Sequence, residues 1–298
     1  MINAAPLNGD MLSPHPSRDM CSDIAVSRRY LKSIDRLKIM RFALFVWLAS
    51  SVMTAPSNAQ PTTSSSDEFV SPAVIVIGFV GGFVRRDDDR HIEVQIIERL
   101  SRENPGIHAV VFENRHTAEA NREVLQWLDR DGNGQLSNKE KESARIILLG
   151  HSWGGSAVNR LASKLNQNGI PVLLTIQLDS INKGRGDDCV VPPNVAQALN
   201  FYQTHGLAHG CQMLRPIDAS RTQIIGNFRF DYATQPPECQ SYSWIDRHVL
   251  KAHNSMDCDP QVWSLVEKQI RVELKDVVRD NPAAGHAGSP PTAASPHD

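Results

Sequence analysis

The sequence lacks several features that would place it in a broad class at once. Its 298 residues carry a net charge of only −2 at pH 7, which gives no sign of a nucleic-acid or anionic-membrane partner. None of its five cysteines stands in a C-x-x-C pair, so a metal or redox motif of that type is not indicated. The glycine-rich run 78–82 lacks the G-x-G-x-x-G spacing of a dinucleotide site. The sequence also has no internal repeat and no apolar run of the roughly 20 residues that span a bilayer.

The apolar run 42–53 predicts a secretory signal. It follows the basic segment 36–41 and precedes a stretch of small residues that ends at Ala59, and these are the three parts of a cleavable signal. An uncleaved membrane anchor is the alternative. Signals normally begin close to the start of a chain, so we expect translation to begin at Met20 or Met40. We therefore expect an exported protein, periplasmic or extracellular, that keeps no stable membrane span after signal cleavage.

Composition divides the rest of the chain into a single domain and its flanks. We predict an extension and signal over residues 1–59, a Ser/Thr/Pro linker over 60–70, one domain over 71–280, and a disordered Ala/Gly/Pro-rich tail over 281–298. Four cysteines lie in the predicted domain: Cys189, Cys211, Cys239 and Cys258. An even number in an exported protein favours two disulfides, and the sequence leaves all three pairings open. Free buried thiols are the alternative.

Strands alternate with helices along the predicted domain. Continuous apolar runs predict strands over 73–77, 108–112, 146–149, 171–178 and 222–230, whereas apolar residues at helical spacing predict helices over 89–103, 117–128, 153–167 and, after Pro193, from Val195 to Tyr202. A last helix is predicted to begin with Asp259 as its cap and Pro260 in its first turn. This alternation predicts an α/β three-layer sandwich: a mostly parallel sheet of about five or more strands with helices on both faces.

The segment Gly150-His151-Ser152-Trp153-Gly154 joins one predicted strand to the helix that follows it. A serine in a sharp strand–turn–helix connection has its hydroxyl held clear of the backbone, and the flanking glycines let strand and helix approach. The amide of Trp153, at the start of the helix, would then point at a developing oxyanion. The position of this motif predicts that Ser152 is a nucleophile.

A nucleophilic serine needs a base, and the base needs an acid to orient it. Asp179 follows the next predicted strand, at the sheet edge where ligands and catalytic groups gather in parallel sheets. His253 is predicted to lie in a loop between the last strand and the last helix. We predict Asp179 as the acid and His253 as the base, with Asp231 and His248 as their respective alternatives.

A second oxyanion donor is expected from the glycine-rich segment 78–82, which follows the first predicted strand at the same sheet edge. We assign this donor to the amide of Phe79. A plain glycine-rich turn is the alternative.

Together these motifs resemble the α/β-hydrolase superfamily, in its compact lipase and esterase branch. The resemblance covers about Ser71 to Lys275 and depends on Gly150–Gly155, on segment 78–82 and on the chain order of the three predicted catalytic residues. It implies acyl transfer to water through an acyl-enzyme on Ser152. Two departures are evident: segment 78–82 lacks the His-Gly pair common in lipases, and no long apolar insertion stands out as a lid.

Residues 129–140 match a calcium loop over twelve positions. The expected oxygen ligands are Asp129, Asp131, Asn133, the carbonyl of Gln135, Ser137 and the bidentate Glu140, with Gly134 at the sharp turn. The segment resembles an EF-hand loop, although only one is present and EF-hands usually pair. We predict a structural Ca²⁺ inserted before the nucleophile strand; a polar turn without metal is the alternative.

The sequence thus predicts an exported serine hydrolase that cleaves carboxylic esters of moderate size. An acyltransferase or a thioesterase with the same three residues is a competing interpretation. A calcium-stabilised binding protein that keeps the fold without catalysis is a third, from a different class. Nothing in the sequence indicates the oligomeric state.

Overall fold

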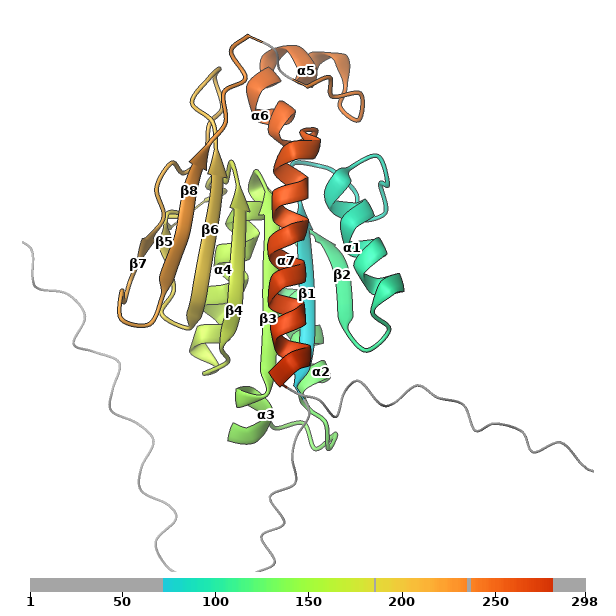
Figure 1. Ribbon diagram of the computed structural model, residues 1–298, viewed down its shortest axis with the longest axis vertical. Helices are drawn as coiled ribbons and strands as arrows, with labels where there is room; N and C mark the ends of the chain where they lie inside the picture. Colours follow the sequence, from blue (N-terminus) through green and yellow to red (C-terminus); the bar gives the residue numbers. More distant parts are fainter. Residues whose placement is uncertain (1–71, 185, 235–236, 281–298) are drawn as a thin grey trace, which may run out of the picture. The chain divides into compact units, whose positions relative to one another are not determined.

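The computed structural model describes residues 72–184, 186–234 and 237–280 (Figure 1). The predicted signal over 1–59, the linker over 60–70 and the tail over 281–298 lie outside these residues. Within the described residues, no helix is both long and apolar enough to cross a bilayer.

A six-stranded sheet with order β2-β1-β3-β4-β6-β8 forms the centre of the described domain. All five of its strand pairs are parallel. Its strands are β1 (Ala73–Val80), β2 (His108–Glu113), β3 (Ala144–His151), β4 (Val172–Leu178), β6 (Val195–Tyr202) and β8 (Gln223–Arg229). A small second sheet pairs β5 (Val190–Val191) with β7 (Arg215–Pro216). Because all the main strands run the same way, their carboxyl ends meet at one edge, where a site is expected.

Helices cover both faces of the sheet, as the alternating pattern predicts (Figure 1). One face carries α2 (Thr117–Leu128) and α4 (Trp153–Gln167), and the other carries α1 (Ile92–Glu103) and α7 (Pro260–Asp280). Successive side chains of β1 alternate between the two cores: Ile75 and Ile77 pack on the α2–α4 side, and Val76 packs on the α1–α7 side. This confirms the three-layer α/β architecture. Three short helices complete it: α3 (Asn138–Glu142), α5 (Trp244–Val249) and α6 (Lys251–Asp257).

One predicted element has the wrong type. Residues 195–202, expected as a helix from the spacing of Val195, Leu199 and Tyr202, form the strand β6, which pairs with β4 on one side and β8 on the other. Pairing on both sides outweighs the helical spacing of a short apolar set. The polar Asn200 is fully buried there, and its side-chain amide donates to the carbonyl oxygen of Cys211 at 3.0 Å. Its hydrogen bond makes a polar residue acceptable inside this sheet.

The connection from β3 to α4 is closely packed against β1. A Cβ atom added at Gly154 would lie 1.9 Å from the carbonyl oxygen of Phe79, and one added at Gly150 would lie 2.6 Å from the backbone of Gly154. Real Cβ atoms do not approach backbone this closely, so only glycine fits at either position. The two glycines of the Gly-x-Ser-x-Gly motif therefore set the distance between strand and helix.

Gly154→Ala is expected to lower the free energy of unfolding by about 3 kcal/mol, because the new methyl group meets backbone that cannot rotate away. Gly106→Ala is the matched control, because an added Cβ there meets no atom within 4 Å. Its effect should stay within about 0.5 kcal/mol. Urea unfolding of both variants makes the comparison, and equal stability of the two would contradict this account of the packing.

Candidate active site

Ser152 and Asp179 stand at the carboxyl ends of the neighbouring strands β3 and β4. Ser152 has φ 57° and Asp179 has φ 42°, and they are the only non-glycine residues with positive φ in the described part of the chain. Such a conformation costs a non-glycine residue about 1–3 kcal/mol and is found mostly at functional sites. Each strained turn directs its side chain to the same sheet edge.

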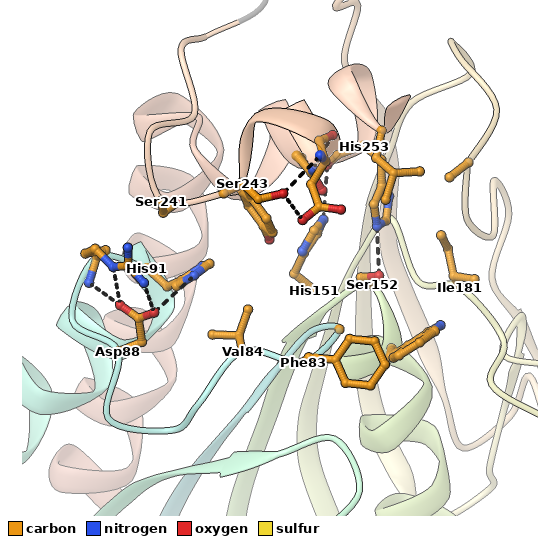
Figure 2. A pocket seen from close by; sticks show the side chains of 18 residues that line it. Phe83, Val84, Asp88, His91, His151, Ser152, Ile181, Ser241, Ser243 and His253 are labelled. Atoms are coloured by element: carbon orange, nitrogen blue, oxygen red, sulfur yellow. Dashed lines mark hydrogen bonds and ion pairs between the residues drawn. The ribbon is translucent and has the colours of Figure 1, made fainter. Parts of the chain in front are cut away.

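The His253 imidazole lies between these two residues. Figure 2 shows it above the Ser152 hydroxyl. Its Nδ1 is 2.7 Å from Asp179 Oδ2, and its Nε2 is 2.7 Å from Ser152 Oγ. All three residues are buried, with relative exposures of 8% for Ser152, 0% for Asp179 and 3% for His253. A hydroxyl, an imidazole and a carboxylate in this order can remove a proton from the hydroxyl and stabilise the resulting imidazolium.

The Asp179 carboxylate is held from three directions. Besides His253, the side-chain amide of Gln203 donates to Oδ2 at 2.7 Å, and the backbone N–H of Gly210 donates to Oδ1 at 2.7 Å. Burial raises the pKa of Asp179, but the hydrogen bonds from these three groups outweigh it, so the pKa lies below its usual value. The carboxylate therefore stays ionised at neutral pH.

The two alternative residues lie elsewhere. Asp231 is exposed and pairs with His205, Oδ1 to Nε2, at 2.9 Å. His248 is exposed, with its Nδ1 2.7 Å from the carbonyl oxygen of Trp244 on its own helix, α5. The base also differs in setting from the prediction, because His253 lies within α6 and not in a loop.

A cavity of about 510 Å³ opens beside Ser152 and His253. Apolar side chains from several loops and α5–α6 line it, together with a few charged ones: Phe83, Val84, Trp153, Ile181, Ala208 and Leu250, with Asp88, Arg90 and Asp246. Figure 2 shows Asp88 and His91 at one side of it, and Ser152 and His253 at the other. Its size and mostly apolar lining suit a small organic ligand.

The structure does not bring Phe79 to this cavity, contrary to the expected role of its amide. Strand β1 continues beyond the predicted end at Ile77 through Val80, so Phe79 pairs with Phe112 and Gly150 inside the sheet and its side chain is fully buried. Strand pairing therefore extends β1 three residues beyond the strand predicted over 73–77.

The segment that follows β1 lies at the cavity instead. Gly82 lines the cavity, and a Cβ added at Gly81 would lie 3.1 Å from Ser152 Cβ. Trp153, the other predicted donor, is the first residue of α4 and lines the cavity. Amides in the first turn of a helix lack an intrahelical partner, so that of Trp153 can serve a ligand.

A buried polar cluster next to these residues has no signal in the sequence. It comprises the buried His91, Glu93, His151 and Asp257 together with the half-buried Tyr242, drawn from four separate stretches of the chain. Only the carboxyl of Glu93 inside the apolar stripe of α1 could have drawn attention, and a single such residue does not identify a partner.

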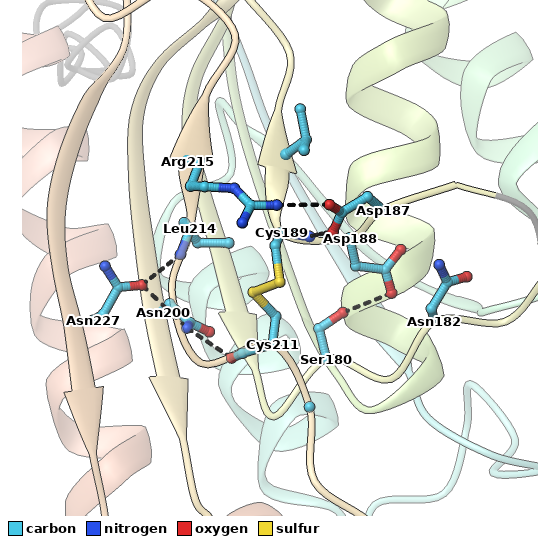
Figure 3. The surroundings of a disulfide bond; sticks show 12 residues. Ser180, Asn182, Asp187, Asp188, Cys189, Asn200, Cys211, Leu214, Arg215 and Asn227 are labelled. Atoms are coloured by element: carbon cyan, nitrogen blue, oxygen red, sulfur yellow. Dashed lines mark hydrogen bonds and ion pairs between the residues drawn. A yellow bond between two sulfur atoms is a disulfide. The ribbon is translucent and has the colours of Figure 1, made fainter. Parts of the chain in front are cut away.

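Two disulfides join Cys189 to Cys211 and Cys239 to Cys258, which selects one of the three possible pairings. Figure 3 shows the first, beside the loop that follows Asp179. Cys211 directly follows Gly210, whose N–H donates to Asp179. The second links the segment before α5 to the residue that caps α6, the helix of the base. The first disulfide thus restrains the loop that holds the Asp179 carboxylate, and the second restrains the helix that carries the imidazole.

The predicted calcium loop folds as a turn between α2 and α3. Carboxylate oxygens of Asp129, Asp131 and Glu140 lie within 4.8 Å of one another, which is compatible with a shared cation. Asn133 and Ser137 are less well placed as ligands: Asn133 Oδ1 accepts from Gln135 N at 2.7 Å, and Ser137 caps α3 in a reciprocal pair with Glu140. Gln135 itself is exposed. Carboxylates are ligands that a hard cation prefers, and those of Asp129 and Glu140 also accept backbone hydrogen bonds that hold the turn together.

No protein-family model and no curated protein matches the sequence. Solved structures give remote matches. A cutinase-like protein from Cryptococcus sp. has a TM-score of 0.25 at 12% identity, over 41% of this chain and 60% of that chain. A thioesterase of the prodiginine pathway in Streptomyces coelicolor has a TM-score of 0.31 at 10% identity, over 60% of this chain and 88% of that one. An esterase from Pyrobaculum calidifontis has a TM-score of 0.22 at 16% identity, over 37% of each chain. Similarity this remote says nothing of substrate or activity.

The buried His151 makes the folded protein sensitive to acid. Burial, reinforced by the charge of His253, lowers the pKa of His151 to about 4. The unfolded chain takes up this proton near pH 6.5 and the folded chain only near pH 4, so stability is lost as the pH falls between these values. The shift corresponds to about 3 kcal/mol.

His151→Gln should therefore flatten the fall in the free energy of unfolding between pH 6.5 and 4, as measured by urea titration at several pH values. His248→Gln, a change at an exposed histidine, is the control and should keep the wild-type slope. A wild-type slope in His151→Gln would show that this residue is not the source of the acid sensitivity.

Proposed function

We propose that the protein is a serine hydrolase that cleaves small carboxylic esters through an acyl-enzyme. The observation that carries this proposal is the position of the His253 imidazole, 2.7 Å from both the Ser152 hydroxyl and the Asp179 carboxylate, beside a cavity. Hydrogen bonds of this length on both ring nitrogens define a proton path from the hydroxyl to the imidazole.

In the first half of the proposed reaction, Ser152 Oγ attacks the ester carbonyl carbon while its proton passes to His253 Nε2. Asp179 stabilises the imidazolium through Nδ1. The tetrahedral intermediate then collapses, and the C–O bond to the alcohol breaks as His253 Nε2 returns the proton to the leaving oxygen. The acyl group remains on Ser152.

In the second half, His253 removes a proton from a water molecule that attacks the acyl carbon. When the second intermediate collapses, its bond to Ser152 Oγ breaks and His253 Nε2 returns the proton to Oγ, which releases the carboxylic acid and restores the serine. The developing negative oxygen needs two donors. We assign one to the amide of Trp153 and, in place of Phe79, the other to an amide in 81–83, the segment that packs beside Ser152.

The volume of the cavity, about 510 Å³, suits a drug-sized molecule. It therefore supports a small ester as the substrate over a polymer. A thioesterase or an acyltransferase uses the same three residues, and transfer to added alcohols in competition with water separates the last of these. Export is proposed on two grounds: the signal pattern of 1–59, and the two disulfides, which persist in oxidising compartments.

A fluorophosphonate probe is expected to label wild-type protein at Ser152, because the probe reports an activated serine hydroxyl. Ser152→Ala should abolish labelling and lower kcat on p-nitrophenyl butyrate by about 10⁴-fold or more, as should His253→Ala. Ser163→Ala, a change on the same helix α4 away from the cavity, is the control and should keep both. Folded wild-type protein that neither labels nor turns over esters would favour the binding-protein alternative.

We also propose that the loop 129–140 binds one structural Ca²⁺, with Asp129, Asp131 and Glu140 as its charged ligands. The clustering of their oxygens within 4.8 Å supports this, together with Gly134, which has the positive φ of 79° that the sharp turn requires. Such an ion would stiffen the connection from α2 to β3, and so to Ser152, without taking part in the reaction.

Calcium is therefore expected to raise the melting temperature in a saturable way, with a stabilisation of about 2.7 kcal/mol at a hundredfold excess over Kd. Glu140→Gln should remove this rise while keeping the start of α3, because glutamine also serves in the capping pair with Ser137. Asp87→Asn, on an exposed loop, is the control and should respond like wild type. A melt that calcium leaves unchanged after chelator treatment would contradict the proposal.

A further inference from the structure

Helix α6 carries two buried titratable residues one turn apart. His253 contacts Ser152 and Asp179, whereas Asp257 contacts a different set of side chains. The Oδ2 atom of Asp257 accepts from His91 Nδ1 at 2.8 Å and from the Tyr242 hydroxyl at 3.0 Å. The same short helix thus takes part in two histidine–carboxylate pairs, only one of which the proposed reaction uses.

The partners of Asp257 come from two other parts of the chain. His91 directly precedes α1, and Tyr242 precedes α5. Their rings meet edge to face, with centroids 5.2 Å apart. Asp257 is 1% exposed and His91 is 3% exposed, so the charge-assisted hydrogen bond between them is buried, whereas the one from Tyr242 is partly buried. The carboxylate therefore ties the helix of the base to both α1 and the segment before α5.

His151 connects this pair to the nucleophile turn. Its Nε2 is 3.1 Å from the carbonyl oxygen of His253, and because a carbonyl only accepts, this nitrogen carries the proton. Its Nδ1 is then a bare acceptor, 3.7 Å from Asp257 Oδ1. His151 immediately precedes Ser152, so the backbone of the base is hydrogen-bonded to the neighbour of the nucleophile.

This cluster is costly for a core. Within the described residues, Glu93 Oε2, His151 Nδ1 and Asp257 Oδ1 are buried without a hydrogen-bond partner. Burial and the nearby Asp257 raise the pKa of Glu93 well above its usual value, whereas His91 and Tyr242 hold that of Asp257 low despite its burial. Such partly satisfied groups destabilise a fold relative to apolar ones, and sites of this kind occur where function requires them.

We infer that Asp257, held by His91 and Tyr242, is a positioning residue: it fixes α6 so that His253 Nε2 stays within reach of the Ser152 hydroxyl. This inference rests on the proposed hydrolase function. Asp257 does not line the cavity and does not touch a reacting atom. Its loss would rotate or loosen α6, and a displacement of about 1 Å at a reacting group costs roughly 10²-fold in rate.

The chain offers a matched control in Asp259. It is also a buried aspartate, 6% exposed, that accepts from a tyrosine hydroxyl, Tyr232, at 2.8 Å. It lies at the start of α7 and caps that helix through the N–H of Gln261. Asp257→Asn and Asp259→Asn therefore make the same chemical change in similar surroundings, on opposite sides of the end of α6.

We expect Asp257→Asn to lower kcat on p-nitrophenyl butyrate by about 10- to 100-fold with KM within about twofold, because chemistry and not binding is disturbed. Asp259→Asn should lower the melting temperature to a similar degree and leave kcat within about twofold. His91→Asn should also lower kcat. The double variant of His91→Asn and Asp257→Asn should lose less kcat than the product of the two single losses, because both changes remove the same contact. Wild-type kcat in Asp257→Asn, or equal losses of kcat in the two aspartate variants, would overturn the inference.

A second measurement needs no substrate. The low-field proton resonance of the hydrogen bond between His253 and Asp179, assigned by its absence in His253→Ala, should shift or broaden in Asp257→Asn and stay unchanged in Asp259→Asn. If the resonance responds in this way in the variants but the wild-type protein neither labels at Ser152 nor cleaves esters, the proposed function is refuted and the positioning role stands. An unchanged resonance in Asp257→Asn would refute the positioning role alone.

Discussion

One imidazole held between a hydroxyl and a carboxylate is the arrangement on which the rest of the structure converges. The three side chains come from positions 152, 179 and 253, so no local segment can bring them together. The parallel sheet does most of this work, because β3 and β4 are neighbours and end at the same edge. Ser152 and Asp179 are then fixed by the sheet itself, each in a strained turn. Only His253 comes from outside the sheet, on helix α6.

Because His253 comes from outside the sheet, its helix α6 is held in place by several contacts of its own. The helix has seven residues, too few to be stable alone, and it follows the last strand of the main sheet. It is restrained by the Asp179 hydrogen bond, by His151, by the Asp257 pair and by the Cys239–Cys258 disulfide. The polar contacts set orientation, and the covalent link limits how far the segment can move.

The parts of this arrangement that depend on local chemistry can be read from the sequence. The glycines around Ser152 indicate a tight turn that other residues could not form. Asp179 directly follows an apolar run that indicates a buried strand. The helical start at Asp259 and Pro260 follows from capping, and the Asp259 side chain indeed accepts from Gln261 N. His253 could be named only by its place late in the chain, and its helix was not foreseen.

The parts that depend on distant neighbours could not be read in this way. Residues 195–202 resemble a helix in isolation and become a strand because β4 and β8 flank them. Phe79 lies past the predicted end of its strand, but pairing with Gly150 and Phe112 extends β1. His91 and Asp257 are 166 positions apart, and neither sits in a pattern that points to the other.

The second disulfide has a consequence for the timing of activity. It closes a loop over 19 positions, and cross-links of that span restrict an unfolded chain by about 3 kcal/mol. The tethered segment is the one that supplies the base, while the serine and its acid belong to the central sheet. Before the thiols are oxidised, a newly made chain lacks this restraint on the segment of His253. We expect the proposed activity to appear only once the thiols have been oxidised, and so outside the reducing compartment where the chain is made.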